Sequence, residues 1–188
     1  MCHEELEIIM DLYHLEYELK PVRVMVVRDL GRIRVDGVEI EVKKGTEIEL
    51  PRWLARLLSS KGYVQLVEST MGLEDIARIH FSVYSAKNII ETPEIPKDFY
   101  WQAQDYIRDL DLRVKQELNP VLLEEKRKAV DFIVDIANRR LIQMLQVLRS
   151  TAAIVEISSK LTPEEKLLLD NLHQVIEKWV KLVTPGER

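Results

Sequence analysis

The chain has 188 residues, of which 46% are hydrophobic and 31% charged, and its formal net charge at pH 7 is −5. This balance is typical of a globular protein with one medium domain or two small ones, and no apolar run approaches the roughly 20 residues that cross a bilayer. The negative charge argues against a chain that binds DNA nonspecifically over its whole surface, because such binding depends on neutralising phosphates.

Residues 1–19 begin with acidic side chains at Glu4 and Glu5 and lack the basic start of a secretory signal. A single cysteine, Cys2, cannot form an internal disulfide, which agrees with a reducing compartment. We therefore expect a cytoplasmic protein with no membrane partner. The role of the segment 1–19 stays open.

Residues 20–68 predict a small β-domain. Its first strand is expected at 22–27, and a hairpin follows with its turn at Asp36-Gly37, a pair that favours a type I′ turn. A two-residue turn fixes the register, so that apolar pairs share one face of the hairpin and ion pairs share the other. The expected pairs are Val35 with Val38, Arg34 with Glu39, Ile33 with Ile40, and Arg32 with Glu41.

A second part of the β-domain contains a strand through Ile48 and Leu50, a short helix that opens at Pro51, and a left-handed cap at Gly62. Four apolar residues of the helix are predicted to line the core of the β-domain. They are Trp53, Leu54, Leu57 and Leu58.

A polar linker at 69–72 precedes a predicted α-helical domain at 73–184, so the expected fold class is α+β. Helical periodicity predicts a first helix at 73–90 and a second that ends before Asn119-Pro120. A third, uninterrupted helix is expected at 121–157, about 50 Å long. Thr162 and Glu165 form the capping box of the last helix. Its predicted buried face is Leu168, Leu172, Val175, Ile176, Trp179 and Val183.

The long helix carries more apolar surface than one small bundle covers, which predicts an interface with another subunit. Trp101 lies two residues after Phe99 and thus points off the buried stripe of its helix. It is either an exposed aromatic contact for a partner, which we favour, or a partly covered surface tryptophan. The candidate interface residues are Trp101, Arg139, Arg140, Leu141, Met144 and Leu148.

Motifs of catalysis and cofactor binding are missing from the sequence. It has no P-loop, nucleophile elbow, dinucleotide fingerprint or metalloprotease histidine pair. Cys2, His3 and His14 lack a fourth donor for zinc. His80 and His173 fit a structural role. Paired acids such as Glu124-Glu125 and Glu164-Glu165 fit the starts of helices. The sequence predicts a protein that is not an enzyme and has no metal or cofactor.

Nucleic-acid binding is the strongest alternative function. Basic residues gather in the β-domain, which could mimic an oligonucleotide-binding barrel. The possible contacts are Arg23, Arg28, Arg32 and Arg34. Two of them, Arg32 and Arg34, face carboxylates in the expected hairpin, and the basic run 126–128 alternates with acids at helical spacing. Any DNA contact is therefore expected to be indirect or weak.

Motifs in both halves of the chain, in the same order, resemble those of GINS subunits. GINS is a four-subunit replication factor of the replicative helicase assembly. The resemblance covers roughly residues 20–183, and residues 1–19 have no counterpart in it. It is carried by Leu50-Pro51-Arg52-Trp53-Leu54-Ala55 with Lys61-Gly62, by Ile95-Pro96-Lys97-Asp98-Phe99-Tyr100, by Asn138-Arg139-Arg140, and by Leu161-Thr162-Pro163-Glu164-Glu165.

The resemblance implies a β-domain (B domain) at 20–68 and a helical A domain at 73–184, in the order of the β-domain-first GINS type and with an archaeal, compact length. It implies a non-catalytic scaffold and adaptor in DNA replication. The implied heterotetramer has two copies of this chain and two of the helical-domain-first subunit. The further partners it implies are the MCM helicase and a RecJ-like nuclease relative, with nucleoid association through the replisome.

Overall fold

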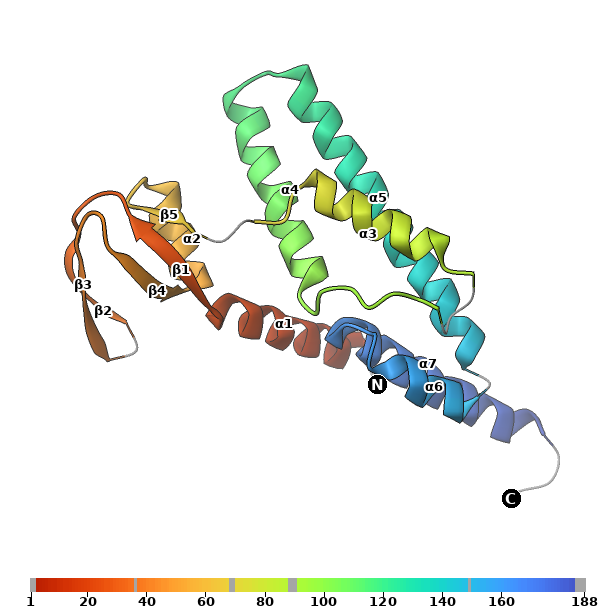
Figure 1. Cartoon of the computed structure of the whole chain (residues 1–188). Helices are drawn as coiled ribbons and strands as arrows, with labels where there is room; N and C mark the ends of the chain where they lie inside the picture. The colour runs from red at the N-terminus through yellow and green to blue at the C-terminus, as the bar shows by residue number, and fades with distance from the viewer. Residues whose placement is uncertain (1–2, 36, 68–69, 88–90, 149, 185–188) are drawn as a thin grey trace. The chain divides into compact units, whose positions relative to one another are not determined.

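The computed structural model describes residues 3–35, 37–67, 70–87, 91–148 and 150–184. The fold is α+β: strands and one short helix follow an N-terminal helix, and the remaining described residues are mostly helical (Figure 1). The chain divides into two compact units, which we call the β unit (residues 4–70) and the helical unit (residues 1–3 and 71–188). This division falls inside the predicted linker 69–72, of which residue 69 lies outside the described residues.

The β unit contains two small antiparallel sheets. In the first, β1 (Pro21–Val26) lies between β4 (Glu47–Pro51) and β5 (Val64–Leu66). The second is the hairpin of β2 (Gly31–Val35) and β3 (Val38–Val42). Alternate side chains of β1 are buried, as the period of a half-buried strand requires. The buried core is Val22, Val24, Val26, Val42, Leu50, Ala55 and Val64.

The predicted register of the hairpin is confirmed at every pair from Val35 with Val38 to Arg32 with Glu41. Asp36 of the predicted turn lies outside the described residues. Arg34 Nη2 lies 4.0 Å from Glu39 Oε1. Glu41 faces Arg32 on the ladder, but its carboxylate binds Lys43 Nζ at 3.0 Å. Only the first of the two predicted cross-strand ion pairs therefore forms, because Lys43 is close enough to take the second carboxylate.

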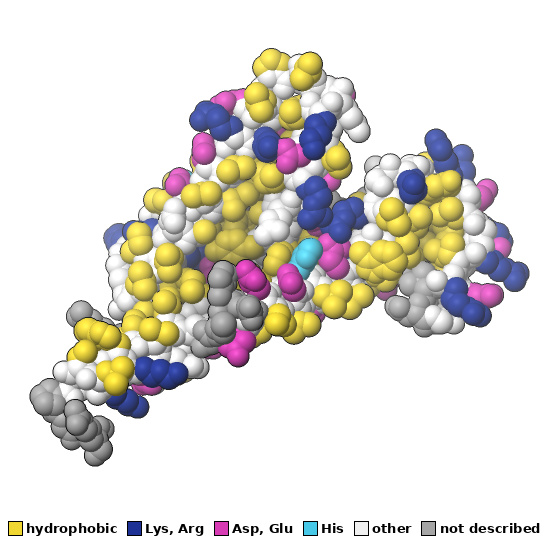
Figure 2. All heavy atoms as spheres, turned by 180° about the vertical axis from the view of Figure 1, so that it is seen from behind, with side chains coloured by type: hydrophobic (Ala, Val, Ile, Leu, Met, Phe, Trp, Pro, Cys, Tyr) yellow, Lys and Arg dark blue, Asp and Glu magenta, His cyan; other side chains and the backbone are white. Residues whose placement is uncertain are grey.

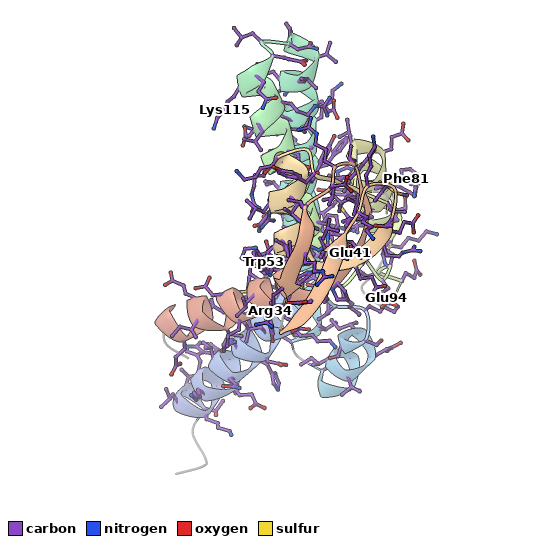
Figure 3. The ribbon with its side chains drawn as sticks, turned by 90° about the vertical axis from the view of Figure 1, so that its left-hand side faces the viewer. Arg34, Glu41, Trp53, Phe81, Glu94 and Lys115 are labelled. Atoms are coloured by element: carbon purple, nitrogen blue, oxygen red, sulfur yellow. The ribbon has the colours of Figure 1, made fainter. Side chains whose placement is uncertain are left out.

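Helix α2 (Arg52–Ser60) packs on this core with a narrower face than the sequence predicts. Leu54 and Leu58 pack against the core. The core prediction is wrong for Trp53 and Leu57, whose side chains are 44% and 46% exposed. Trp53 is labelled in Figure 3. The sheets are small, so they cover only one side of the helix, and residues 53 and 57 lie about 100° around from residues 54 and 58.

The helical unit contains α3 (Leu73–Ser85), α4 (Phe99–Gln116), α5 (Pro120–Val147), α6 (Thr151–Ser158) and α7 (Pro163–Val183). Helices α3 and α4 both pack on α5 (Figure 1). The first helix ends at Ser85, before the predicted end near residue 90, and residues 88–90 lie outside the described part. The core between these helices is Met71, Ile76, Val83, Ile95, Phe99, Ala103, Ala129 and Ile136.

The prediction of one helix over 121–157 is wrong. Helix α5 ends at Val147 after 28 residues, about 42 Å, and Ser150 caps a separate helix by accepting a hydrogen bond from the Ala153 amide at 3.3 Å. This capping competes with continuation of the helix. The turn brings α6 and the start of α7 onto the end of α5. The resulting core is Met144, Val147, Leu148, Ile157, Leu161 and Leu169.

Helix α7 extends past the end of α5. Arg140 contacts Glu165, and Met144 and Leu169 share one core, so the two helices run in the same direction. Beyond Arg140, α5 continues only to Val147, whereas α7 continues to Val183. The predicted buried face of α7 holds for Leu168, Leu172 and Ile176. It is wrong for Val175, Trp179 and Val183, which are exposed.

No helix in the described part of the chain combines the length and the apolar character needed to cross a membrane.

Candidate interaction surface

A buried arginine joins three parts of the helical unit. The Arg140 guanidinium is 1% exposed. It donates from Nε and Nη2 to the two carboxylate oxygens of Glu165, the second at 2.7 Å, and from Nη1 to the Pro93 carbonyl at 3.1 Å. Nη2 also donates to the Lys160 carbonyl at 3.1 Å. These bonds fix the end of α5 against the start of α7 and the segment before α4.

Glu165 completes the network on the other side. Its carboxylate accepts from the Tyr100 hydroxyl at 2.8 Å and from the Thr162 amide at 3.0 Å, while the Glu165 amide donates to Thr162 Oγ1 at 3.3 Å. The last two bonds are the capping box predicted from sequence. Burial of the phenol, with the Glu165 carboxylate beside it, raises the pKa of Tyr100 well above its ordinary value. The network is a structural device, since all of its hydrogen bonds join parts of the fold.

The predicted interface set mostly faces the chain's own interior. Arg140, Met144 and Leu148 are buried, and Leu141 packs beside them. The cause is the turn after Val147, which folds α6 and α7 over this side of α5. The prediction that these residues form an exposed interface is therefore wrong.

Two other members of that set also differ from expectation. The Trp101 side chain is only 8% exposed, so the prediction of an exposed aromatic contact is wrong. Phe99 and Trp101 point about 160° apart around α4, and both are buried. Arg139 is half-buried; its Nη2 donates to the Ala86 carbonyl at 3.2 Å and its guanidinium lies 5.9 Å from the Tyr84 ring.

An apolar face does remain uncovered on α5, at positions next to those predicted. We call Leu123, Val130, Val134 and Leu145 the α5 face; all four are exposed. They are separated by seven, four and eleven residues, and each of these spacings returns to the same side of a helix. Part of it borders a shallow groove of about 410 Å³ between α4 and α5, which Ala103, Ile107 and Ile133 also line. Figure 2 shows hydrophobic side chains gathered over these two helices.

A second apolar surface lies where α7 runs past α5. We call Val175, Trp179, Val180, Leu182 and Val183 the α7 end; all five are exposed. They share one side of the helix, within an arc of about 160°, opposite Glu177 and Lys181, and an apolar face of this width normally packs against another element. The apolar character of these residues is visible in the sequence. Because the preceding helix was expected to extend to residue 157, the same residues were expected to pack inside the bundle.

A third surface belongs to residues 3–19, whose role the sequence left open. They form α1, which exposes Ile8, Leu12, Leu15 and Leu19. The spacing of four, three and four residues is the signal by which sequence reasoning could have found this stripe.

His80 contacts a carboxylate and two aromatic rings. Its Nε2 lies 3.3 Å from Asp135 Oδ2, and its ring centroid lies 4.6 Å from those of Tyr84 and Phe132. These contacts join α3 to α5 and resemble those of a structural histidine. Within the described residues, no cluster of three histidine, cysteine, aspartate or glutamate side chains is placed to hold a metal ion.

The basic residues are interleaved with acids. Arg28, Arg32 and Arg34 are exposed in the β unit, and Arg23 faces Glu49 across the sheet. The shallow hollow beside Lys43 and Lys44 also contains Asp29 and Glu41, and the Lys44 amide donates to Asp29 Oδ1 at 2.6 Å. Carboxylates at this spacing weaken the attraction for a phosphate chain.

The basic run 126–128 on α5 is likewise paired. Lys126 Nζ lies 2.5 Å from Asp111 Oδ1, and Arg127 Nη2 lies 2.8 Å from Glu124 Oε1. Lys128 Nζ is 3.8 Å from the same Glu124 oxygen. The hydrogen bond from Arg127 lowers the pKa of the Glu124 carboxyl. The local ion pairs expected from sequence are therefore present.

The contact between Tyr106 and Glu125 predicts a pH dependence. The Tyr106 hydroxyl donates to Glu125 Oε1 at 2.5 Å, and burial together with this bond raises the pKa of Tyr106 to about 12. Since the folded pKa lies above the unfolded value near 10, the bond stabilises fully below about pH 10, and this stability is lost as the pH rises through about 12. We expect the difference in denaturation midpoint between the native chain and Tyr106→Phe to be constant below about pH 10 and to shrink above it.

Tyrosinate absorbance checks the same assignment, because the Tyr106→Phe variant should lack one tyrosine that titrates near pH 12. Equal titration curves for the two proteins would contradict it.

Comparison with models of known protein families finds no match to this chain, and comparison with curated proteins also finds none. Function is therefore inferred from the sequence motifs and from the surfaces described above.

Proposed function

We propose that the chain is a non-catalytic GINS subunit of the archaeal, β-domain-first type, which acts as scaffold and adaptor in the replicative helicase assembly. Its partners would be the helical-domain-first subunit, with two copies of each chain, the MCM helicase and a RecJ-like nuclease relative. It would work at the nucleoid through the replisome. The observation that carries the proposal is the apolar surface of the helical unit left uncovered by the single chain.

The α5 face and the α7 end are suited to an obligate subunit interface. Such interfaces are more apolar than the rest of a protein surface, and an uncovered apolar patch usually marks a partner site. Trp179 adds an aromatic side chain of the kind that concentrates binding energy. A second subunit packed on these residues would supply the neighbours that α7 lacks beyond the end of α5.

The arrangement of the GINS-like motifs also supports the proposal. The motif at 138–140 and the motif at 161–165 are joined by the bonds between Arg140 and Glu165. Tyr100, from the motif at 95–100, donates to the same Glu165 carboxylate. The motif residues therefore act together as a framework, which is consistent with a family resemblance based on structural positions.

Helicase unwinding tests the proposal. Added with a helical-domain-first GINS subunit, the chain is expected to raise the ATP-driven unwinding rate of the MCM helicase without hydrolysing ATP or nucleic acid itself. The effect would arise from preferential binding to one helicase conformation. A nuclease or ATPase activity that follows the chain and disappears with one substitution would contradict the proposal.

A matched pair of variants tests whether the α5 face is the interface with the partner subunit. Val134→Asp places a charge in the α5 face and is expected to weaken assembly with the partner subunit by at least about tenfold, whereas Val155→Asp on α6, also exposed, should leave it unchanged. The affinity can be measured by calorimetry. Equal affinities for the two variants would exclude the α5 face as the interface.

The alternative function is that of an oligonucleotide-binding accessory protein. The observation that favours it is the exposure of Arg28, Arg32 and Arg34 in one small β unit. It predicts DNA affinity that falls steeply with salt, and a shallower salt slope in the Arg32→Ala, Arg34→Ala double variant. The scaffold function predicts that this double variant barely changes DNA affinity.

A further inference from the structure

Helix α1 (His3–Leu19) exposes a regular apolar stripe. Ile8, Leu12, Leu15 and Leu19 are between 53% and 59% exposed. Their spacing is that of the a and d positions of a coiled coil, which place leucine-type side chains in one seam. The stripe spans about 16 Å, or three turns of helix.

The C-terminal turn of α1 is attached to α2 and fixes the direction of the stripe. The Arg52 guanidinium lies 4.4 Å from the centroid of the Tyr17 ring, and Arg56 Nη2 lies 2.6 Å from Glu18 Oε1. Tyr17 is two residues from both Leu15 and Leu19, so it points to the opposite side of the helix. Because Tyr17 is buried, the stripe is presented away from α2.

The stripe lies on a strongly acidic helix. From His3 to Leu19 the sequence contains six carboxylates and neither lysine nor arginine. Exposed Glu16 lies on one border of the stripe and exposed Asp11 lies on the other, at the positions from which a coiled coil selects its partner by charge.

We propose that α1 is a docking helix for another protein, and that this partner presents an apolar helical ridge flanked by lysine and arginine. The charge of α1 argues against a second copy of the helix and against a membrane as the partner. Pairing α1 with α1 of a second copy would bring twelve carboxylates together, and anionic headgroups would repel the helix from a membrane surface. The inference concerns the β unit alone and does not rest on the proposed function.

A basic coiled-coil peptide serves as the probe, with leucine at its seam positions and lysine at its flanking positions. An acidic peptide with the same seam serves as the control. We expect the full chain to bind the basic peptide more tightly than the acidic one in fluorescence anisotropy, and to bind it more weakly as salt increases. Equal binding of the two peptides would overturn the proposal.

Two variants separate the seam from its charged borders. Leu12→Ser with Leu15→Ser should weaken binding of the basic peptide by at least about tenfold, while Val155→Ser on α6 should not change it. Asp11→Lys with Glu16→Lys should reverse the preference, so that the acidic peptide binds more tightly. These side chains are exposed, so circular dichroism is expected to show both variants folded.

Two further outcomes would replace the proposed partner by another. Self-association of the native chain in sedimentation that disappears in Leu12→Ser, Leu15→Ser would make a second copy the occupant. Binding of the native chain to vesicles of anionic phospholipid, lost in the same variant, would make a membrane the occupant. Either result would overturn the proposal of a basic protein partner.

Discussion

Arg140→Ala is expected to lower the free energy of unfolding of the helical unit by about 3–5 kcal/mol, the usual loss when one member of a buried ion pair is removed. The substitution leaves the Glu165 carboxylate buried without its guanidinium, and it leaves the Pro93 and Lys160 carbonyls without their donors. Since small domains have a total stability of about 5–15 kcal/mol, this loss is a large part of the whole.

The adjacent residue provides the control. Arg139→Ala removes a half-buried guanidinium that donates to the Ala86 carbonyl and contacts the Tyr84 ring, and we expect a loss of about 1 kcal/mol. Replacing both members of the buried pair, with Arg140→Met and Glu165→Met, should cost less than Arg140→Ala alone because no buried charge is left. Chemical denaturation measures all three variants. Equal losses for Arg139→Ala and Arg140→Ala would contradict the role assigned to the network.

Leu50→Ala is expected to have the second largest effect, a loss of about 2–5 kcal/mol in the β unit. Leu50 is completely buried at the centre of a core that is small for an independent domain. Amide exchange should therefore lose protection throughout 21–66 while the helical unit keeps it.

Trp53→Ala is the matched comparison, because the sequence places Trp53 in the same core and the structure does not. With 44% of its side chain exposed, Trp53 should cost well under half as much as Leu50 when it is replaced by alanine. If Trp53→Ala removed protection as completely as Leu50→Ala, the position of α2 on the sheet would be wrong. Loss of protection in both units together would contradict the division at residue 70.

Local rules were sufficient for several elements. The register of the β2–β3 hairpin follows from its two-residue turn. The cap of α7 follows from Thr162 and Glu165, and that of α5 from Asn119, whose side chain accepts from the Val121 amide at 2.9 Å. Gly62, with φ of 72°, ends α2 as expected from a left-handed cap. Each of these features depends on residues close together in the chain.

The predictions that failed concern which side chains are buried by neighbouring elements. Helical periodicity shows that Trp53 and Trp101 belong to helices, but burial depends on how far the neighbouring elements extend, and this reversed both assignments. The sequence predicts Arg140 as an interface residue. Its burial requires Glu165, 25 residues later, and the turn at Ser150 that brings the two together. That turn also removed Met144 and Leu148 from the candidate interface.

The most direct test of the proposed scaffold function is the native mass of the complex that copurifies with the tagged chain from the cells that produce it. We predict an assembly with two copies of this 22.0 kDa chain and two copies of a helical-domain-first GINS subunit, associated with the MCM helicase. A stable 22.0 kDa monomer at micromolar concentration, with no such subunit bound, would contradict the proposal.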